Sequence, residues 1–351
     1  MKLRRAVVMF FFPMVLGATA ASPSFAQGKI PLSVMELIPT PDVTVSFMAM
    51  ARDLGLFDKN GLAVTIKSGA GGGPHRIQNL EGGEAGIATS DIIAAMSATY
   101  QGSDVKIIMV PSARYGAAIV AHKKYTDVRQ LKGKLWSVPS LGGSARFMTV
   151  IVLKHFGLSD KDVQWKAAGG TAGTLAILYS GQIDAITLVP TALPLMKGPE
   201  ARDAHVLVAN TAQITPPFPN FVFVAKKSWL DKNPQAAERF VTAMMEMMRD
   251  MAANKARFAL AVARLTPGLY SPEDVDGMWK SLSEGGFWAV NGGINLASVK
   301  GVLDVFFEIR GDKPNDKLNK AADLFDTGPM KRVLDKMGVA PKSKDVPDWR
   351  R

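Results

Sequence analysis

Three clusters of hydroxyl-bearing and glycine residues each stand directly before a helical pattern. Backbone N–H groups in the first turn of a helix lack intrahelical partners and carry the positive end of the helix dipole, so such a turn suits an anion. The same residue types are also ordinary helix caps, and each single residue fits that structural role equally well. The cluster residues that we expect to contact a ligand are Thr89, Ser90, Asp91, Ser140, Gly143, Ser144 and Thr171.

Two arginines and one tyrosine near these clusters add complementary chemistry. Arg114 and Tyr115 follow an expected strand and supply a counter-charge and a stacking face, and Arg146 lies one turn into its helix. A guanidinium can bind a carboxylate through two parallel hydrogen bonds, although each arginine also suits a solvated surface. Further candidates at the same site are Thr40 and Asp42, in the loop after the first strand, and Phe218, in a proline-rich segment.

The residue types needed for catalysis are not arranged for it. The chain has no cysteine, which excludes disulfides and thiolate chemistry. Its four histidines lack zinc-ligand spacing and nearby carboxylates, and no G-x-S-x-G nucleophile motif is present. We therefore expect no catalytic residue, no metal and no cofactor.

Short segments rich in β-branched residues alternate with helical patterns along most of the chain. This alternation is typical of a doubly wound α/β architecture. In such sheets ligands bind beyond the carboxyl ends of the strands, where the clusters lie. The expected strands are 30–37, 62–67, 85–89, 105–110, 135–139, 163–166, 183–189 and 205–209.

One stretch of the chain occurs twice. Ala70-Gly71-Gly72 returns as Ala168-Gly169-Gly170, and the same offset continues to a threonine in each copy, Thr89 and Thr187. Two copies of this length indicate two similar lobes rather than a solenoid. We expect turns from both copies, Thr187 included, to face one cleft that closes by hinging.

Two longer strands, 117–122 and 221–225, bracket the second copy and are interpreted as the crossings between lobes. The first lobe then comprises 27–118 and 222–351, and the second comprises 119–221.

Residues 236–265 predict a single long helix between two prolines. Four of its methionines share one face, at a spacing that a soft metal such as Cu(I) could use but that is far more typical of a buried helix face. They are Met244, Met247, Met248 and Met251.

The first residues predict export. Lys2, Arg4 and Arg5 precede an apolar run and then small residues, which is the pattern of a secretory signal peptide spanning 1–26 and cleaved after Ala26. The net charge of +11 comes without a long basic block, so we expect no nucleic acid partner. These features predict a periplasmic protein.

Several motifs resemble a known family in their order and spacing. They are Ala51-Arg52-Asp53-Leu54-Gly55-Leu56-Phe57, Leu80-Glu81-Gly82-Gly83-Glu84, Ser140-Leu141-Gly142-Gly143-Ser144 and Ser180-Gly181-Gln182-Ile183-Asp184-Ala185. Together they resemble solute-binding proteins of ABC importers, in the branch for nitrate, sulfonates, taurine and thiamine-pyrimidine precursors. Gly86 departs from the family, whose aspartate at this point is matched by Asp184 in the second copy.

The resemblance implies an α/β, two-lobed periplasmic binding protein of type II, with each lobe a doubly wound sheet flanked by helices. It implies a monomer that captures a small, anionic organic solute (a sulfonate, carboxylate, aromatic acid or pyrimidine) and passes it to the membrane permease and ATPase of an ABC importer. The alternative is a secreted enzyme, or a receptor for a sensor protein, on the same fold. Pyrimidine-forming enzymes of the superfamily share the fold, but they use pyridoxal phosphate in the cytoplasm and carry a cysteine-rich motif that is absent here.

Overall fold

A computed structural model shows the fold. It describes residues 28–37, 40, 43–69, 72–168, 171–215, 218–341, 343, 345 and 347. The expected signal peptide and Asp42 lie outside the described residues.

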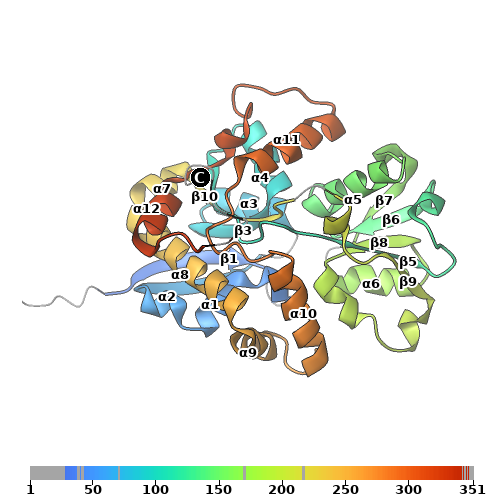
Figure 1. The fold of residues 1–351 in the computed structure, drawn as a ribbon. Coiled ribbons are helices and arrows are strands. Elements are labelled where there is room, and N and C mark those ends of the chain that lie inside the picture. The colour runs from blue at the N-terminus through green and yellow to red at the C-terminus, as the bar shows by residue number, and fades with distance from the viewer. Residues whose placement is uncertain are drawn as a thin grey trace, which may run out of the picture.

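Two five-stranded sheets lie side by side, each in its own lobe (Figure 1). The first sheet has the order β2-β1-β3-β10-β4, in which β10 runs antiparallel to both of its neighbours. Its strands are β1 (Ile30–Glu36), β2 (Leu62–Ser68), β3 (Ile87–Asp91), β4 (Val105–Met109) and β10 (Phe221–Lys226).

The second sheet repeats this topology. Its order is β7-β6-β8-β5-β9, and β5 is the antiparallel strand between β8 and β9. The equivalence of the two orders confirms the two half-units that the sequence repeat predicts. The strands are β5 (Ala118–His122), β6 (Leu135–Val138), β7 (Gln164–Ala167), β8 (Ala185–Leu188) and β9 (Ala204–Val208).

The strands 117–122 and 221–225, interpreted from the sequence as the crossings between lobes, correspond to β5 and β10. β5 belongs wholly to the second sheet and β10 to the first. The chain passes between the sheets in the connections before them, residues 110–117 and 209–220.

Helices cover both faces of each sheet (Figure 1). Those within the two repeat units are α1 (Phe47–Asp53), α2 (Leu56–Lys59), α3 (Gly73–Glu81), α4 (Ile92–Tyr100), α5 (Ser144–His155) and α6 (Thr171–Tyr179). Those after β10 are α7 (Lys227–Lys232), α8 (Pro234–Ala253), α9 (Lys255–Leu265), α10 (Pro272–Glu284), α11 (Leu296–Arg310) and α12 (Gly328–Met337). Short 3-10 helices are η1 (Val43–Val45), η2 (Val128–Leu131), η3 (Asp160–Asp162), η4 (Pro190–Leu195), η5 (Pro199–Asp203), η6 (Thr211–Gln213) and η7 (Ala321–Leu324).

The single long helix expected over 236–265 is two helices, α8 and α9. Asn254 between them is extended, and its Oδ1 accepts a hydrogen bond from the Arg257 N–H at 3.1 Å. An asparagine that caps a new helix in this way ends the preceding one. The methionine face of α8 is fully buried in the core of the first lobe, as expected for a structural face.

The departure at Gly86 has a steric cause. A Cβ atom at Gly86 would lie 2.6 Å from the Trp229 ring, which fills the space. In the second copy Asp184 accepts hydrogen bonds from the Tyr125 hydroxyl and the Leu135 N–H, so its carboxylate ties strands together. The aspartate is therefore a structural residue in one lobe, and an indole ring replaces it in the other.

Candidate functional site

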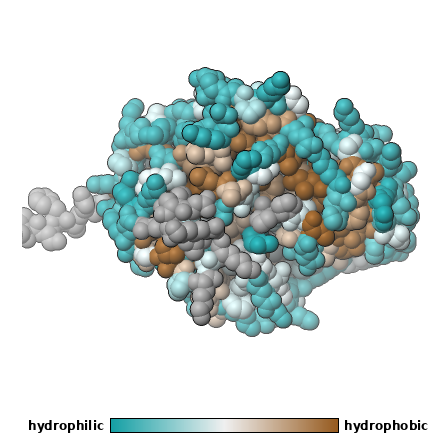
Figure 2. Space-filling view, turned by 45° about the horizontal axis from the view of Figure 1, so that its top comes forward, coloured by the Kyte–Doolittle hydropathy of each residue, from teal (hydrophilic) through white to brown (hydrophobic). Residues whose placement is uncertain are grey.

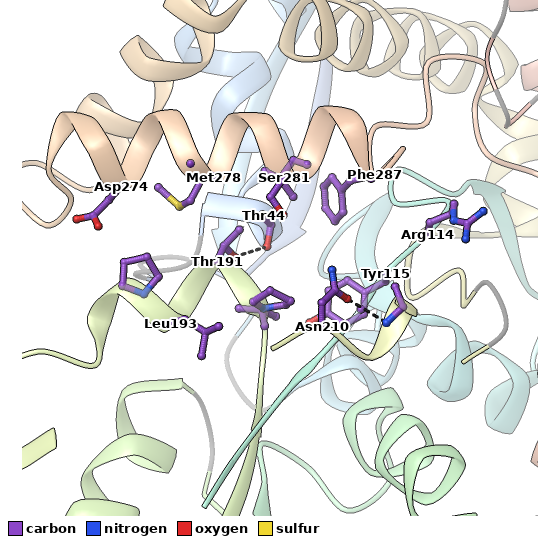
Figure 3. Close-up of a pocket in the computed structure, with 18 of the residues that line it drawn as sticks. Thr44, Arg114, Tyr115, Thr191, Leu193, Asn210, Asp274, Met278, Ser281 and Phe287 are labelled. Atoms are coloured by element: carbon purple, nitrogen blue, oxygen red, sulfur yellow. Dashed lines mark hydrogen bonds between the residues drawn. The ribbon is translucent and has the colours of Figure 1, made fainter. Parts of the chain in front are cut away.

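A cavity of about 470 Å³ lies between the lobes. One wall is α10 of the first lobe, with Met278 and Ser281, and the opposite wall is η4 of the second lobe, with Thr191 and Leu193 (Figure 3). The two connections between the sheets close one end with residues 114–116, 210 and 212. The cavity therefore touches both lobes and both hinges, which is where a ligand would control lobe closure.

Charged groups stand at opposite ends of this cavity (Figure 3). Asp274 lies at one end and binds Lys197 of the second lobe at 2.6 Å, a hydrogen bond that lowers the pKa of the Asp274 carboxyl. Exposed Glu273 lines the same end. Arg114 lies at the other end and makes no hydrogen bond or ion pair with any part of the chain that the structure describes. Between the ends the walls are largely apolar.

Tyr115 and Asn210 shape the hinge side of the cavity. Tyr115 is buried and packs edge-on against Phe221, with ring centroids 5.3 Å apart. Its N–H donates to the Phe218 carbonyl at 2.9 Å, and Phe218 itself is buried behind the wall. A Cβ atom at Gly116 would lie 1.9 Å from Asn210 Oδ1, so only glycine fits where the two connections meet.

At two of the three hydroxyl and glycine clusters, one N–H group of the helix is bonded to a protein carboxylate. Asp91 caps α4 by accepting from the Ala94 N–H at 3.0 Å. The same oxygen, Oδ1, accepts from the N–H and the hydroxyl of Ser144, at 3.2 and 3.0 Å. Ser144 is the first residue of α5 in the other lobe, so one carboxylate binds the N-termini of two helices. Burial raises the pKa of Asp91, against the opposing effect of these hydrogen bonds.

A second protein carboxylate occupies the N-terminus of α1. Glu36 is fully buried and accepts from the N–H groups of Met48 at 2.8 Å and Ala49 at 2.9 Å. Burial raises its pKa to about 7, because the hydrogen bonds only partly offset the cost of desolvating the charge. Thr89 contributes its hydroxyl to Glu36 at 3.5 Å.

Arg76 supplies the cation between these two acids. It is 5% exposed, and its guanidinium donates to the carbonyl oxygens of Gly69 and Thr89. Burial lowers its pKa, while the charges of Asp91 and Glu36 act in the opposite direction.

The remaining expected residues are placed as follows. Ser90 is buried and donates to the Gly73 carbonyl, at 3.1 Å. Arg146 donates hydrogen bonds to Asp160 at 2.7 and 3.2 Å. Thr187 is buried, accepts from the Trp136 indole at 3.0 Å, and lines a small space of about 50 Å³.

Ser140 is half-buried, and Gly143, the residue before α5, is buried. Thr40 lies just beyond β1, and Thr171 begins α6. The ligand-contact role of all these residues stays a prediction.

Sequence reasoning missed Glu36, Arg76 and the α10 wall. Two signals were available in the sequence. Glu36 is a charged residue at the end of an apolar strand, and Arg76 is a charged residue next to apolar Ile77 in a helix. Nothing in the sequence of α10 shows that it faces the other lobe.

Figure 2 shows one face of the molecule with hydrophilic residues over most of the rim and hydrophobic residues gathered toward the middle. No helix within the described residues is long and apolar enough to cross a membrane.

The two sheets and the cavity between them define a two-lobed protein with the periplasmic binding protein fold, as the sequence predicts. Residues 42–257 match the family described as NMT1/THI5 like, and the chain belongs to that family. None of the curated protein sequences matches it.

Several solved structures share the fold. A protein from Bordetella bronchiseptica RB50 is 20% identical with a TM-score of 0.70, over 88% of this chain and 98% of its own. The alkanesulfonate-binding protein SsuA from Xanthomonas axonopodis pv. citri, bound to MOPS, is 16% identical with a TM-score of 0.67, over 85% and 99%. The periplasmic aliphatic sulphonate binding protein SsuA from Escherichia coli is 16% identical with a TM-score of 0.59, over 85% and 98%.

Proposed function

We propose that this chain is the periplasmic solute-binding component of an ABC importer and that it captures a small organic anion between its lobes. The observation that carries the proposal is the interlobe cavity of about 470 Å³ with Arg114 at one end, where it has no hydrogen-bond or ion-pair partner among the described residues. A cavity of this size holds a small molecule, and a guanidinium without a protein partner favours a carboxylate or sulfonate.

The side chains that line the cavity indicate which class of solute it would bind. Met278, Leu193 and Phe287 line the cavity and favour an apolar body, while Arg114 favours an anionic group at one end of it. An aliphatic sulfonate or an aromatic carboxylate has this form. The ligand classes in the names of the two SsuA proteins support the inclusion of sulfonates.

The proposed mechanism is binding without chemistry. The solute bridges α10 of one lobe and η4 of the other, so its binding free energy favours the closed arrangement of the lobes. A permease and an ATPase in the membrane then receive the solute from the closed, monomeric receptor.

The test is a ligand screen of the secreted protein by thermal shift, with titration calorimetry on each hit. A ligand that binds only the native state raises the melting temperature by mass action. The panel contains aliphatic sulfonates, aromatic carboxylates, nitrate and neutral pyrimidines, and mass spectrometry checks that each ligand leaves unchanged.

We expect an organic anion as the tightest ligand. Arg114→Gln should weaken its binding at least about tenfold, since a charge-assisted pair is lost. Arg52→Gln, a change at an exposed arginine outside the cavity lining, should leave the affinity unchanged. Tightest binding of a neutral pyrimidine, or conversion of the ligand to a product, would contradict the proposal.

A further inference from the structure

Asp91 is the buried carboxylate through which the two lobes touch. It ends β3 of the first sheet, and Ser144 begins α5, which packs on β8 of the second. Both residues are buried, with exposed fractions of 7% and 3%. Two hydrogen bonds, at 3.2 and 3.0 Å, join them across the junction.

The backbone around Asp91 is shaped to this carboxylate. A Cβ atom at Gly73, the first residue of α3, would lie 2.0 Å from Asp91 Oδ2. A Cβ atom at Gly143 would lie 3.4 Å from the same oxygen. Buried Arg76 contributes a favourable charge interaction from α3. The carboxylate therefore lies at the first residues of three helices, and the charge of Arg76 acts on it favourably.

Other contacts hold α5 in this position against the first lobe. Phe147 of α5 stacks on Phe306 of α11, with ring centroids 6.0 Å apart. Lys154, at the other end of α5, binds Glu308 of α11. The Asp91–Ser144 contact is thus one part of an interface between the lobes that extends along α5.

Helix N-termini that face a cleft are the natural place for a solute anion, because their N–H groups and dipoles need no further counter-charge. Here the anion already present belongs to the protein. Its two bonds to Ser144 exist only while the lobes are together.

We propose that Asp91 is a specificity-determining residue of the cleft: its carboxylate occupies the N-termini of α4 and α5, joins the lobes in the absence of solute, and excludes the anionic group of the solute from these amides. The inference rests on the proposed function in so far as the cleft is the solute site. The inference places the anionic group of the solute at the Arg114 end of the cavity. The sequence analysis instead favours the backbone N–H groups at the hydroxyl and glycine clusters.

The test removes the Asp91 carboxylate by substitution and measures whether a small added anion binds in its place. Asp91→Ser keeps an N-cap for α4 but removes the charge and most of the volume. The probe is inorganic sulfate in titration calorimetry, which reports saturable binding apart from the general stabilising effect of this salt. We expect Asp91→Ser to bind sulfate at least tenfold more tightly than the natural protein, and its radius of gyration in solution scattering to increase without ligand.

The matched control is Asp127→Ser, the same change at a half-buried N-cap aspartate of the second lobe, at the start of η2. It should leave both the sulfate affinity and the radius unchanged. Asp91→Gly, which also permits an N-cap, is the second variant if Asp91→Ser does not fold. Equal sulfate binding by the natural protein and the folded variant, or failure of both variants to fold, would overturn the assignment. Neither result would affect the ligand screen, so the two proposals can fail separately.

Discussion

The buried carboxyl of Glu36 gives the sharpest prediction, because its pKa is raised from an ordinary 4.5 to about 7 by burial. The folded-state pKa lies above the unfolded value, so the native state binds this proton more tightly than the unfolded chain does. Stability from this group is therefore fully present below about pH 4.5 and is lost as the pH rises to about 7. A shift of this size corresponds to about 3 kcal/mol.

The perturbation is Glu36→Gln, which removes the titration. The amide nitrogen cannot accept a hydrogen bond, so the variant loses one of the bonds from Met48 and Ala49 at every pH. The informative quantity is the pH dependence of the difference in unfolding free energy between variant and natural protein. Between about pH 5 and about pH 8, the unfolding free energy of the variant should rise by about 2–3 kcal/mol relative to that of the natural protein.

Urea unfolding, followed by tryptophan fluorescence across this pH range, measures the difference. Glu84→Gln, at an exposed position, is the control for loss of a carboxylate in general. A difference between the Glu36 variant and the natural protein that stays constant from acid to alkaline pH would refute the reasoning.

Three further substitutions probe helix capping and packing in the first lobe. Gly73→Ala places a methyl group 2.0 Å from Asp91 Oδ2 and should cost about 1–3 kcal/mol in thermal unfolding, whereas Gly301→Ala, in open space on α11, should not destabilise. Asn254→Ala removes the cap that starts α9 and should cost about 1 kcal/mol in urea unfolding; an unchanged midpoint would show that the cap is not needed. Met248→Ala opens the buried face of α8 and should cost about 2–5 kcal/mol, and a cost within error of zero would contradict the burial seen here.

Local pattern was enough for most of the architecture. All the strands expected from β-branched runs are present, with ends displaced by one or two residues, and the repeated glycine turn marks α3 and α6 at equivalent places in the two sheets. Alternation and turn glycines act over a few residues, so they can be read without knowledge of the rest of the chain. The prediction of one long helix after residue 236 is wrong at Asn254, because the side chain of Asn254 caps a new helix there although the apolar pattern continues.

The site depended on contacts that no local pattern records. The hydroxyl and glycine clusters do begin helices, but one N–H group of α4 and one of α5 are bonded to the Asp91 carboxylate. Glu36 meets α1, and Thr44 on η1 meets Thr191 of the second lobe at 3.4 Å, only because the chain folds back on itself. A helix terminus is open to a ligand only if no distant side chain fills it, and burial and long-range pairing decide that after the two lobes have come together.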